Sequence, residues 1–473
     1  MAQPATRLTT PSQSPSRLIR RLRRCSNSSH RRSEVNTMSW LSRYRLRLYL
    51  RNSIWIFPVI SIALALASAR LLGRIELAQG WALNLNPDTG RTVMSTIASS
   101  MFALVVIASS AVLLVVQLAS AQLTPRIIAF VYRSRVRKIS LTVFAFTFTF
   151  SVGALVRIED RVPLLTSYVG AYGFLINLAL FLYFIDSVGK TVRPSAALTM
   201  VALAGRREIH SLYPSRLSEN HTTSPDSNEL LNREVRRIIA NELDGVLLAF
   251  DRKGLVSLAE RTNCIIELVP QVGDFVAAGD PLFRICDGGE GLTVESLRKS
   301  VAFGQERTLE QDPMFALRII VDIASKALSP AINDPTTAVL SIDQLHHLLR
   351  DVGSRSLAEG RDVDSKGKVR LMYRTPNWED FVNLAVTEIR QYGRDSIQIM
   401  RRLRAMLDNL IETLPERRAP LLQHELALLT SSSIRMFPDT SDQDLAHMPD
   451  LQGMGGGQKE KRDYKDKEFP IVA

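Results

Sequence analysis

Four long apolar segments lie within the first 190 residues of this chain, at residues 54–73, 92–122, 139–157 and 165–188. A helix of about 20 apolar residues crosses a hydrocarbon core of about 30 Å. Because every backbone polar group must be satisfied inside a bilayer, such segments fold as helices. The pattern therefore predicts a domain of four transmembrane helices at residues 39–190. The second half of the chain has the composition of an ordinary water-exposed domain.

The formal net charge of +12 is concentrated beside the first apolar segment. Residues 1–51 contain twelve arginines and one acid, Glu34, which together give +11 and leave about +1 for the other 422 residues. Basic residues next to a membrane span attract anionic headgroups and set topology. We therefore expect a lipid bilayer with anionic headgroups as the partner of this segment, and no nucleic acid.

Both ends of the chain are predicted to be disordered, at residues 1–38 and 431–473, because their polar compositions offer little to pack. The N-terminal tail has no apolar core of a signal peptide. Met38 is a second candidate for the native start, which N-terminal peptide mapping would decide. The three cysteines have no CxxC spacing, so neither a metal site nor a disulfide framework is indicated, and no cofactor is expected.

Basic residues alternate across the connections between the apolar segments. The stretch before the first segment and the second connection are rich in arginine, whereas the first and third connections balance arginines with acids. The positive-inside rule then places both termini, and the whole C-terminal half, in the cytoplasm.

Polar side chains recur along the second apolar segment. Ser99, Ser110 and Gln117 are 11 and 7 residues apart, which places them on one helical face, and Ser120 continues the trend. Asn177 in the fourth segment is expected to face the same interior. One interpretation is helix–helix packing through small and amide side chains; the other is a polar lining for a solute path. No segment carries a charge at mid-depth, which argues against a proton-coupled or voltage-sensing mechanism.

The sequence after the fourth segment predicts a linker and connecting helix at residues 191–242, with the connecting helix at 229–242, and a β module at residues 243–290. Gly273-Asp274 and Gly279-Asp280 are turn signals on either side of a short strand. This stretch resembles the barrel-sandwich module of biotinyl and lipoyl carriers and of membrane-fusion adaptors. A carrier needs a lysine at a hairpin tip, and none follows this strand pair. We therefore expect a structural or ligand-docking module.

Two Asp-Pro pairs begin predicted helices in a helical cytoplasmic domain at residues 291–430. Asp312 and Asp334 suit the N-cap position, and the prolines that follow suit the first helical turn. Capping alone explains both pairs. The alternative is one cluster around an anion or polar ligand at two helix N-termini, made of Arg307, Gln311, Asp312, Asn333, Asp334 and Thr337. No catalytic residues are indicated, because no acid pair, nucleophile elbow, metal spacing or phosphate loop is evident.

The whole organisation resembles a bacterial family of predicted membrane proteins, the domain of unknown function 2254 family. The resemblance runs over roughly residues 40–430 and is carried by residues 53–58, 117–126, the Gly-Asp stretch, Gln311-Asp312-Pro313 and residues 328–338. It implies a four-span, multi-pass protein of the bacterial inner membrane with no established activity.

The expected fold is therefore an α-helical membrane domain of four transmembrane helices, followed by an α+β cytoplasmic region with a barrel-sandwich-like β module and a helical bundle. Three functions stay open. The first is a non-enzymatic membrane protein with a cytoplasmic sensing or gating domain, extended to permeation of an ion or small solute. The second is a membrane-tethered scaffold or assembly factor. The third is an enzyme acting on a lipid or cell-envelope precursor, with the cluster at residues 307–337 as its site. A homo-oligomer is one option, since four spans often need further copies to enclose a path.

Overall fold

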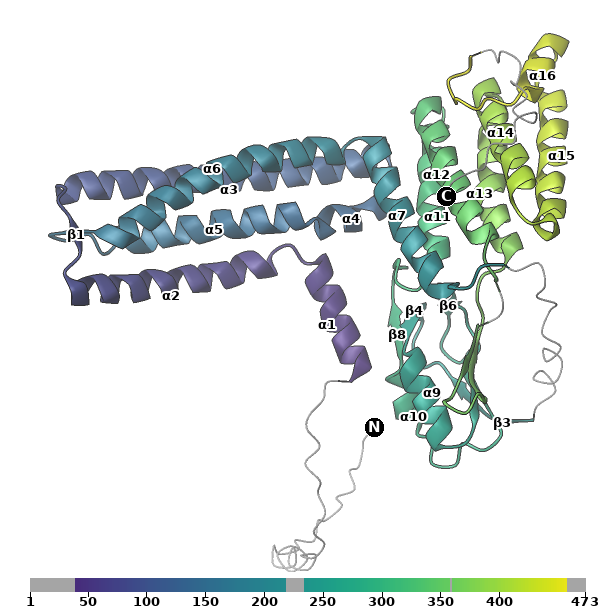
Figure 1. The fold of residues 1–473 in the computed structure, drawn as a ribbon, viewed down its shortest axis with the longest axis horizontal. Helices are drawn as coiled ribbons and strands as arrows, with labels where there is room; N and C mark the ends of the chain where they lie inside the picture. The colour runs from purple at the N-terminus through teal and green to yellow at the C-terminus, as the bar shows by residue number, and fades with distance from the viewer. Residues whose placement is uncertain (1–38, 218–233, 358–359, 457–473) are drawn as a thin grey trace, which may run out of the picture. The chain divides into compact units, whose positions relative to one another are not determined.

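The computed structural model describes residues 39–217, 234–357 and 360–456 (Figure 1). The predicted N-terminal tail, part of the predicted linker and residues 457–473 lie outside the described residues.

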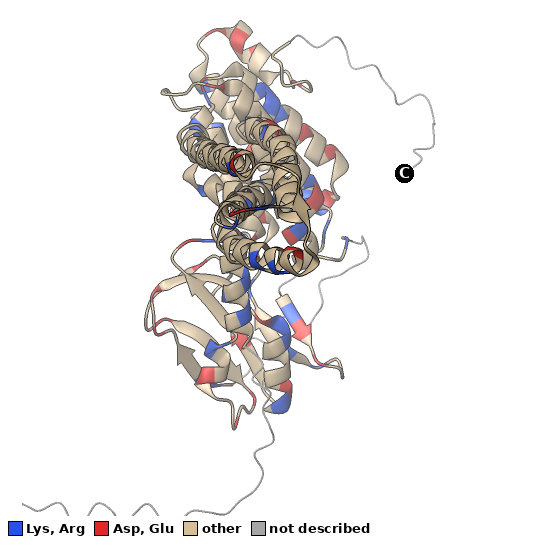
Figure 2. Ribbon diagram, turned by 90° about the vertical axis from the view of Figure 1, so that its left-hand side faces the viewer, with Lys and Arg blue, Asp and Glu red and all other residues tan. Residues whose placement is uncertain are grey.

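Four of the described helices are long and apolar enough to cross a membrane, and they lie side by side (Figure 1). Their bounds match the predicted spans to within a few residues: α2 Ile56–Gln79, α3 Pro87–Gln122, α5 Arg135–Leu155 and α6 Leu164–Thr191. In Figure 2 these helices are seen end-on, and their ribbons are mostly tan, with some blue and red residues. Short segments complete this part of the chain: α1 Trp40–Asn52, β1 Ala82–Leu83, η1 Pro125–Ile127, α4 Ile128–Arg133 and β2 Val162–Pro163.

Helix α3 is much longer than a bilayer core. Its 36 residues span about 54 Å, compared with about 30 Å of hydrocarbon. The helix begins with Pro87 after an Asn86 cap, and the chain turns at Leu123 before Pro125. The last two turns of α3 and the segment after it join the large hydrophobic core of the C-terminal region through Val115, Ala119 and Leu123. Helix α3 therefore belongs to both the candidate membrane domain and the C-terminal region.

The β region consists of two sheets. One has five strands in the order β3-β7-β5-β10-β9, and the other has three in the order β6-β4-β8. Among the described strands of these sheets, β10 and β5 pair in parallel and the remaining pairs are antiparallel. The elements are β3 Val235–Ala240, β4 Gly245–Phe250, α9 Arg252–Arg261, β5 Ile265–Leu268, β6 Phe275–Val276, β7 Pro281–Cys286, α10 Val294–Arg298, β8 Val301–Gly304, β9 Gly360–Val363 and β10 Val369–Tyr373.

The predicted barrel-sandwich module is not confirmed, because the described strands form two open sheets and no closed barrel. The sheets differ from a barrel-sandwich because one of their strands comes from about 100 residues later in the chain. β10 pairs with β5 and brings β9 with it, so the Gly-Asp stretch shares its sheets with strands on both sides of it in sequence.

Helices pack together in the rest of the C-terminal region, and α11 is the most buried of them. Its residues Ala316, Ile320 and Ala324 are fully buried, and α7 approaches so closely that a Cβ at Gly205 would lie 2.6 Å from the Cβ of Ala316. The elements are α7 Pro194–Leu212, α11 Pro313–Ala327, α12 Pro335–Gly353, α13 Trp378–Tyr392, α14 Ile397–Thr413, η2 Glu416–Arg418, α15 Ala419–Met436 and α16 Thr440–His447.

The structure differs from the sequence-based expectation at two places. Residues 431–456 are not a disordered tail, because α15 continues through Met436, α16 follows, and the next segment packs against α14. There the guanidinium of Arg401, 1% exposed, donates hydrogen bonds to the carbonyl oxygens of Met448, Gly455 and Gly456. In addition, the described part of the predicted connecting helix at 229–242 is mainly strand β3, which pairs with β7.

Candidate ligand cavity at the start of helix α11

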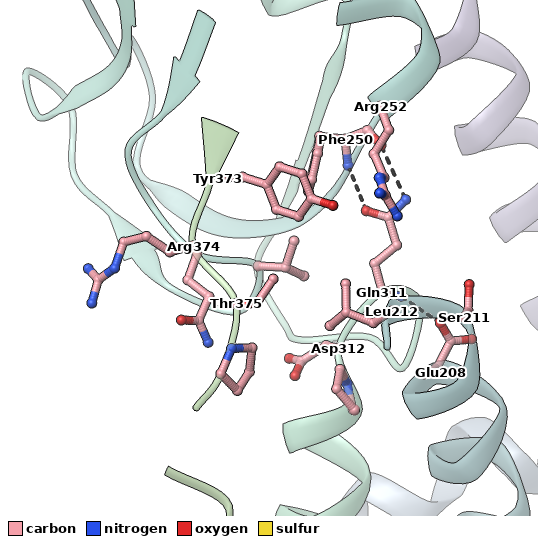
Figure 3. Close-up of a pocket in the computed structure, with 14 residues that line it drawn as sticks. Glu208, Ser211, Leu212, Phe250, Arg252, Gln311, Asp312, Tyr373, Arg374 and Thr375 are labelled. Atoms are coloured by element: carbon pink, nitrogen blue, oxygen red, sulfur yellow. Dashed lines mark hydrogen bonds between the residues drawn. The ribbon is translucent and has the colours of Figure 1, made fainter. Parts of the chain in front are cut away.

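A cavity of about 80 Å³ lies where α7, the two sheets and the start of α11 meet (Figure 3). We call it the α11 cavity. Its lining residues are Glu208, Ser211, Leu212, Phe250, Arg252, Gln271, Val272, Gln311, Asp312, Pro313, Tyr373, Arg374, Thr375 and Pro376. Five separate segments of the chain therefore contribute to one site.

An aspartate cap followed by a proline starts helix α11 at this cavity. Asp312 is the N-cap, and its Oδ1 accepts a hydrogen bond of 3.0 Å from the backbone N–H of Phe315. Pro313 occupies the first turn, where no backbone donor is needed. The positive end of the helix dipole therefore points toward the cavity.

Gln311 adopts a backbone conformation that is unusual for its residue type. Its φ is +60°, in the left-handed region that a residue with a Cβ rarely enters. Its backbone N–H donates to Glu208 Oε2 at 3.1 Å. Its side-chain amide pairs with the backbone of Phe250 at both ends, accepting from the N–H at 3.1 Å and donating to the carbonyl at 3.2 Å (Figure 3). These bonds join α7 and β4 to the start of α11 and hold the strained residue in place.

The second carboxylate oxygen of Asp312 has no hydrogen-bond partner among the described residues. Asp312 is 3% exposed, and its Oδ2 is buried. The closest cation is Arg307, whose Nε lies 3.8 Å away and donates instead to the carbonyl oxygen of Gly273 at 2.8 Å. Burial raises the pKa of Asp312 to about 6, although Arg307 opposes the increase. The carboxyl group therefore titrates close to neutral pH.

The turn at Gly273-Asp274 covers Asp312. Gly273 has a φ of +97°, and a Cβ there would lie 2.7 Å from Asp312 Oδ2 and 2.7 Å from Arg307 Nη2. The backbone N–H of Gly273 donates to the carbonyl oxygen of Leu247 at 2.8 Å, which fixes the turn to β4. A glycine is required here both by the backbone conformation and by the close approach.

Tyr373 and Arg252 form the wall of the cavity on the side of the sheets. The guanidinium carbon of Arg252 lies 5.2 Å from the centre of the Tyr373 ring, and Arg252 pairs with Asp362. Burial raises the pKa of Tyr373 to about 12, so its hydroxyl stays neutral. Burial also raises the pKa of Glu208. The arrangement suits a small polar group that donates a hydrogen bond to Asp312, or the polar end of a larger ligand.

The structure divides the six residues of the predicted cluster into two groups. Arg307, Gln311 and Asp312 lie together at the start of α11. The remaining three lie at the start of α12, beyond a 15-residue helix that is about 22 Å long: they are Asn333, Asp334 and Thr337. There the Asp334 N–H donates to the Ala327 carbonyl at the far end of α11. The enzyme hypothesis needed both groups in one site. Because they lie at opposite ends of α11, they do not form one site.

The predicted polar membrane face is also divided. Ser99, Ser110 and Gln117 are exposed on α3, and Ser120 is partly buried near α11. Asn177 is fully buried, and its Nδ2 donates to Thr147 Oγ1 at 2.7 Å, between α6 and α5. Asn177 therefore packs helices together within one copy of the chain, whereas the α3 residues face outward.

Sequence reasoning did not identify Glu208, Arg252, Tyr373 or Thr375 as parts of the site. They come from segments that are distant in sequence, and only the fold brings them to Asp312. The one available signal was Glu208, an acid in a helix whose nearby positions Gly205 and Ile209 are small or apolar.

Helix α11 also contacts the end of α3. Arg126, just beyond α3, forms an ion pair with Asp322, and its guanidinium carbon lies 5.8 Å from the centre of the Phe315 ring. Lys326 donates to the carbonyl oxygen of Ser120 at 2.8 Å. The helix that begins at the cavity is therefore attached along its length to a candidate membrane helix.

A family model described as "Predicted membrane protein (DUF2254)" matches residues 51–409. Uncharacterized proteins of Mycobacterium bovis and Mycobacterium tuberculosis are each 27% identical to this chain over 435 residues, which covers 86% of this chain and 81% of each relative. No solved structure matches the chain.

Proposed function

This chain belongs to the DUF2254 family of predicted membrane proteins, and on that premise we propose that it is a ligand-regulated membrane protein and not an enzyme. A small polar ligand, or a proton, occupies the α11 cavity at Asp312. Binding at Asp312 changes the position or mobility of α11, and this change is transmitted to α3 and the other candidate membrane helices.

One observation carries this proposal: a single helix has at its start Asp312, whose buried Oδ2 accepts no hydrogen bond within the described residues, and has the α3 contacts along its side. Phe315 is the residue whose N–H binds Asp312 Oδ1, and its ring also lies under the Arg126 guanidinium. A ligand that binds the Asp312 carboxylate therefore acts on the turn of α11 that contacts Arg126. An unsatisfied buried carboxylate is costly, which favours a role in binding over a role in capping alone.

The proposal includes a bacterial inner-membrane location with the C-terminal region in the cytoplasm. Its support is the charge of the connections. The side of the membrane helices that bears Arg126, Arg133, Arg137 and Lys138 is the side on which the C-terminal region follows.

Permeation of an ion or small solute is the extension of this proposal, and it requires more than one copy of the chain. Ser99, Ser110 and Gln117 face outward from α3, so only α3 helices of neighbouring copies can enclose a path lined by them. Polar side chains on a lipid-facing surface are unfavourable and are satisfied when helices associate.

Hydrogen exchange tests the regulatory step without an identified ligand. Asp312→Asn imitates the protonated carboxyl while keeping a good N-cap. We expect Asp312→Asn to change exchange rates in peptides covering residues 115–127 of the full chain in lipid nanodiscs. The matched control is Asp334→Asn, the same substitution at the other Asp-Pro start. Equal exchange in both variants and the native chain would contradict the proposal.

Flux measurements in liposomes test the permeation extension separately. If the outward face of α3 lines a path, Gln117→Leu abolishes ion or small-solute flux, and Asp312→Asn alters it. An absence of flux at every pH and potential removes permeation but leaves the exchange result standing.

A second candidate function, a membrane-tethered scaffold, is favoured by apolar side chains exposed on the β region. Phe275 is 68% exposed and Leu243 is 76% exposed. If they form a docking surface, a stoichiometric cytoplasmic partner co-purifies with the native chain and is lost with Phe275→Ser. Retention of the partner in that variant would count against this surface.

A further inference from the structure

A second and larger cavity lies at the ends of the candidate membrane helices. Its volume is about 520 Å³. We call it the basic cavity. Its charged lining residues are Arg51, Arg133, Arg137, Asp186, Lys190, Arg207, Glu208 and Glu310. The start of α5, the end of α6 and one face of α7 all contribute to it, so it lies at the level where a bilayer would meet the C-terminal region.

Five cations line the basic cavity, compared with three carboxylates, and the carboxylates already have partners. Glu310 accepts from Arg51 at 2.8 Å, and Asp186 pairs with Lys190 at 2.6 Å on the adjacent turn of α6. The third carboxylate, Glu208, binds the backbone N–H of Gln311. Positive charge therefore remains in excess in the cavity.

Two of the guanidinium groups bind neutral acceptors within the described ranges and form no ion pair there. Arg137 is 1% exposed; it donates to the carbonyl oxygen of Val131 at 2.7 Å and to Thr191 Oγ1 at 3.0 Å. Arg133 donates to Asn52 Oδ1 at 2.9 Å. Burial and the charge of Arg51 lower the pKa of Arg133, although the charge of Glu310 opposes the decrease. Arg137 is therefore a buried cation that forms no ion pair within the described residues, which is unfavourable, and an anion in the cavity would compensate its charge.

Apolar side chains lie beside these cations. Tyr183 of α6 is 57% exposed, Leu203 of α7 is 50% exposed, and Met200 completes this part of the lining. Tyr183 belongs to a candidate membrane helix and is exposed, so it would contact lipid when that helix is in a bilayer. A cationic pocket with an apolar side suits an amphiphile whose charged end is a phosphate.

We propose that the basic cavity binds the phosphate headgroup of an anionic phospholipid, with Arg133, Arg137, Lys190 and Arg207 around the phosphate and the acyl chains along Tyr183 and α6. This inference is independent of the ligand at Asp312. A free phosphate would satisfy the same cations, but it makes no use of the exposed apolar side chains, so the lipid is the occupant that the surface favours.

Lipid affinity of the purified full chain in neutral detergent tests this site. The probes are phosphatidylglycerol, phosphatidylcholine and inorganic phosphate, and the readout is native mass spectrometry with thermal unfolding as a second measurement. Arg207→Gln and Lys190→Gln change exposed residues and leave the fold intact. Arg206→Gln is the matched control, because Arg206 is the neighbour of Arg207 on α7 but pairs with Asp351 outside the cavity.

We expect phosphatidylglycerol to bind more tightly than phosphatidylcholine and to raise the unfolding temperature. Each of Arg207→Gln and Lys190→Gln weakens that binding about fivefold, the change expected from losing one cation near a headgroup, and Arg137→Gln weakens it further. Arg206→Gln leaves it unchanged.

Three results would overturn the inference. Equal binding of the two lipids removes the charge recognition. Equal affinities of Arg207→Gln and Arg206→Gln place the lipid outside the cavity. Displacement of phosphatidylglycerol by inorganic phosphate, with an equal rise in unfolding temperature, makes the occupant a soluble anion.

Discussion

Helices α11 and α12 begin with the same local structure and differ in what surrounds it. Each starts with a left-handed residue, an aspartate N-cap and a proline, and each aspartate accepts a hydrogen bond from the backbone N–H three residues later. At α12 the second oxygen of Asp334 accepts from Thr337 Oγ1 at 2.5 Å. At α11 the corresponding oxygen of Asp312 is buried and has no hydrogen bond. One motif therefore serves as a complete cap at α12 and as a cap with one free acceptor at α11.

The residues before the two aspartates show the same contrast. Asn333 is a residue type that tolerates the left-handed conformation, and it is exposed. Glutamine tolerates this conformation less well, and the hydrogen bonds of Gln311 to Glu208 and Phe250 hold its backbone in the left-handed region. Strain supported by contacts from two other elements is typical of positions that bind or switch. The four predictions below change one start at a time.

The largest effect is expected from filling the space above Asp312, which has no counterpart at Asp334. Gly273→Ala places a Cβ against the carboxylate at a positive φ, and we expect it to lower the free energy of unfolding by about 3 kcal/mol. Gly279→Ala is the control, because Gly279 has a similar φ of +95° with no atom within 4 Å of the added Cβ; its cost should be about 1 kcal/mol. If Gly273→Ala and Gly279→Ala lower the free energy of unfolding equally in denaturant, the turn at Gly273 is not in close contact with Asp312.

Removing the charge of Asp312 should reveal the cost of burying it. The folded-state pKa of about 6 lies above the ordinary value of 3.8, so the folded state retains the proton between these values while the unfolded chain loses it. The contribution of Asp312 to stability is therefore most favourable below pH 3.8 and is lost as the pH rises to about 6. The gap of about two pH units corresponds to about 3 kcal/mol.

Asp312→Asn should abolish this pH dependence and make the chain more stable than the native protein at pH 7. Unfolding of the two proteins from pH 4 to 8 measures both effects. Asp334→Asn should change neither. The difference in unfolding free energy between the native chain and Asp312→Asn isolates the effect of Asp312. If this difference does not change from pH 4 to 6, the pKa of Asp312 is not raised.

Removing the side-chain bonds of Gln311 should cost about 2 kcal/mol, because Gln311→Ala leaves the backbone groups of Phe250 without partners. Asn333→Ala places the same residue in the same conformation and should cost about 1 kcal/mol. Gln311→Gly relieves the strain but not the lost bonds, so its unfolding midpoint should lie between those of Gln311→Ala and the native chain. Identical midpoints for Gln311→Ala and Asn333→Ala would remove the contrast.

The smallest effect is expected from making the α12 start resemble the α11 start. Thr337→Val deletes the hydroxyl that binds Asp334 Oδ2. Because Asp334 is partly exposed, water replaces this donor, and the loss should be about 1 kcal/mol or less. No new dependence on pH should appear between pH 4 and 6. If one appears, exposure to solvent is not what distinguishes the two aspartates.

Sequence reasoning predicted the elements whose signals are local. The four candidate membrane helices follow from apolar length, and the starts of α11 and α12 follow from their Asp-Pro caps. The end of the chain shows the limit of this approach. Residues 431–456 look polar and rich in glycine, yet α15 and α16 extend through residues 431–447, and the segment after them is held by the buried Arg401, which donates to its carbonyl groups.

The candidate site was only half predicted, for two physical reasons. Grouping Asp312 with Asp334 overlooked the length of the helix between them, which separates their positions by about 22 Å. The partners of Gln311 and Asp312 could not be found from the sequence, because Glu208, Phe250 and Tyr373 reach the site through helix packing and through the pairing of β10 with β5.

Helix α3 contains no proline after Pro87, and its one glycine, Gly90, lies close to its start. Without a site for a kink, it moves as a stiff rod. At its start the rod is held tightly, since a Cβ at Gly90 would lie 2.7 Å from Val162. If α3 pivots at this close contact, its sideways displacement grows in proportion to the distance from Gly90. A small shift of α11 at the other end would therefore move Gln117 through a wider arc than Ser110, and Ser110 through a wider arc than Ser99.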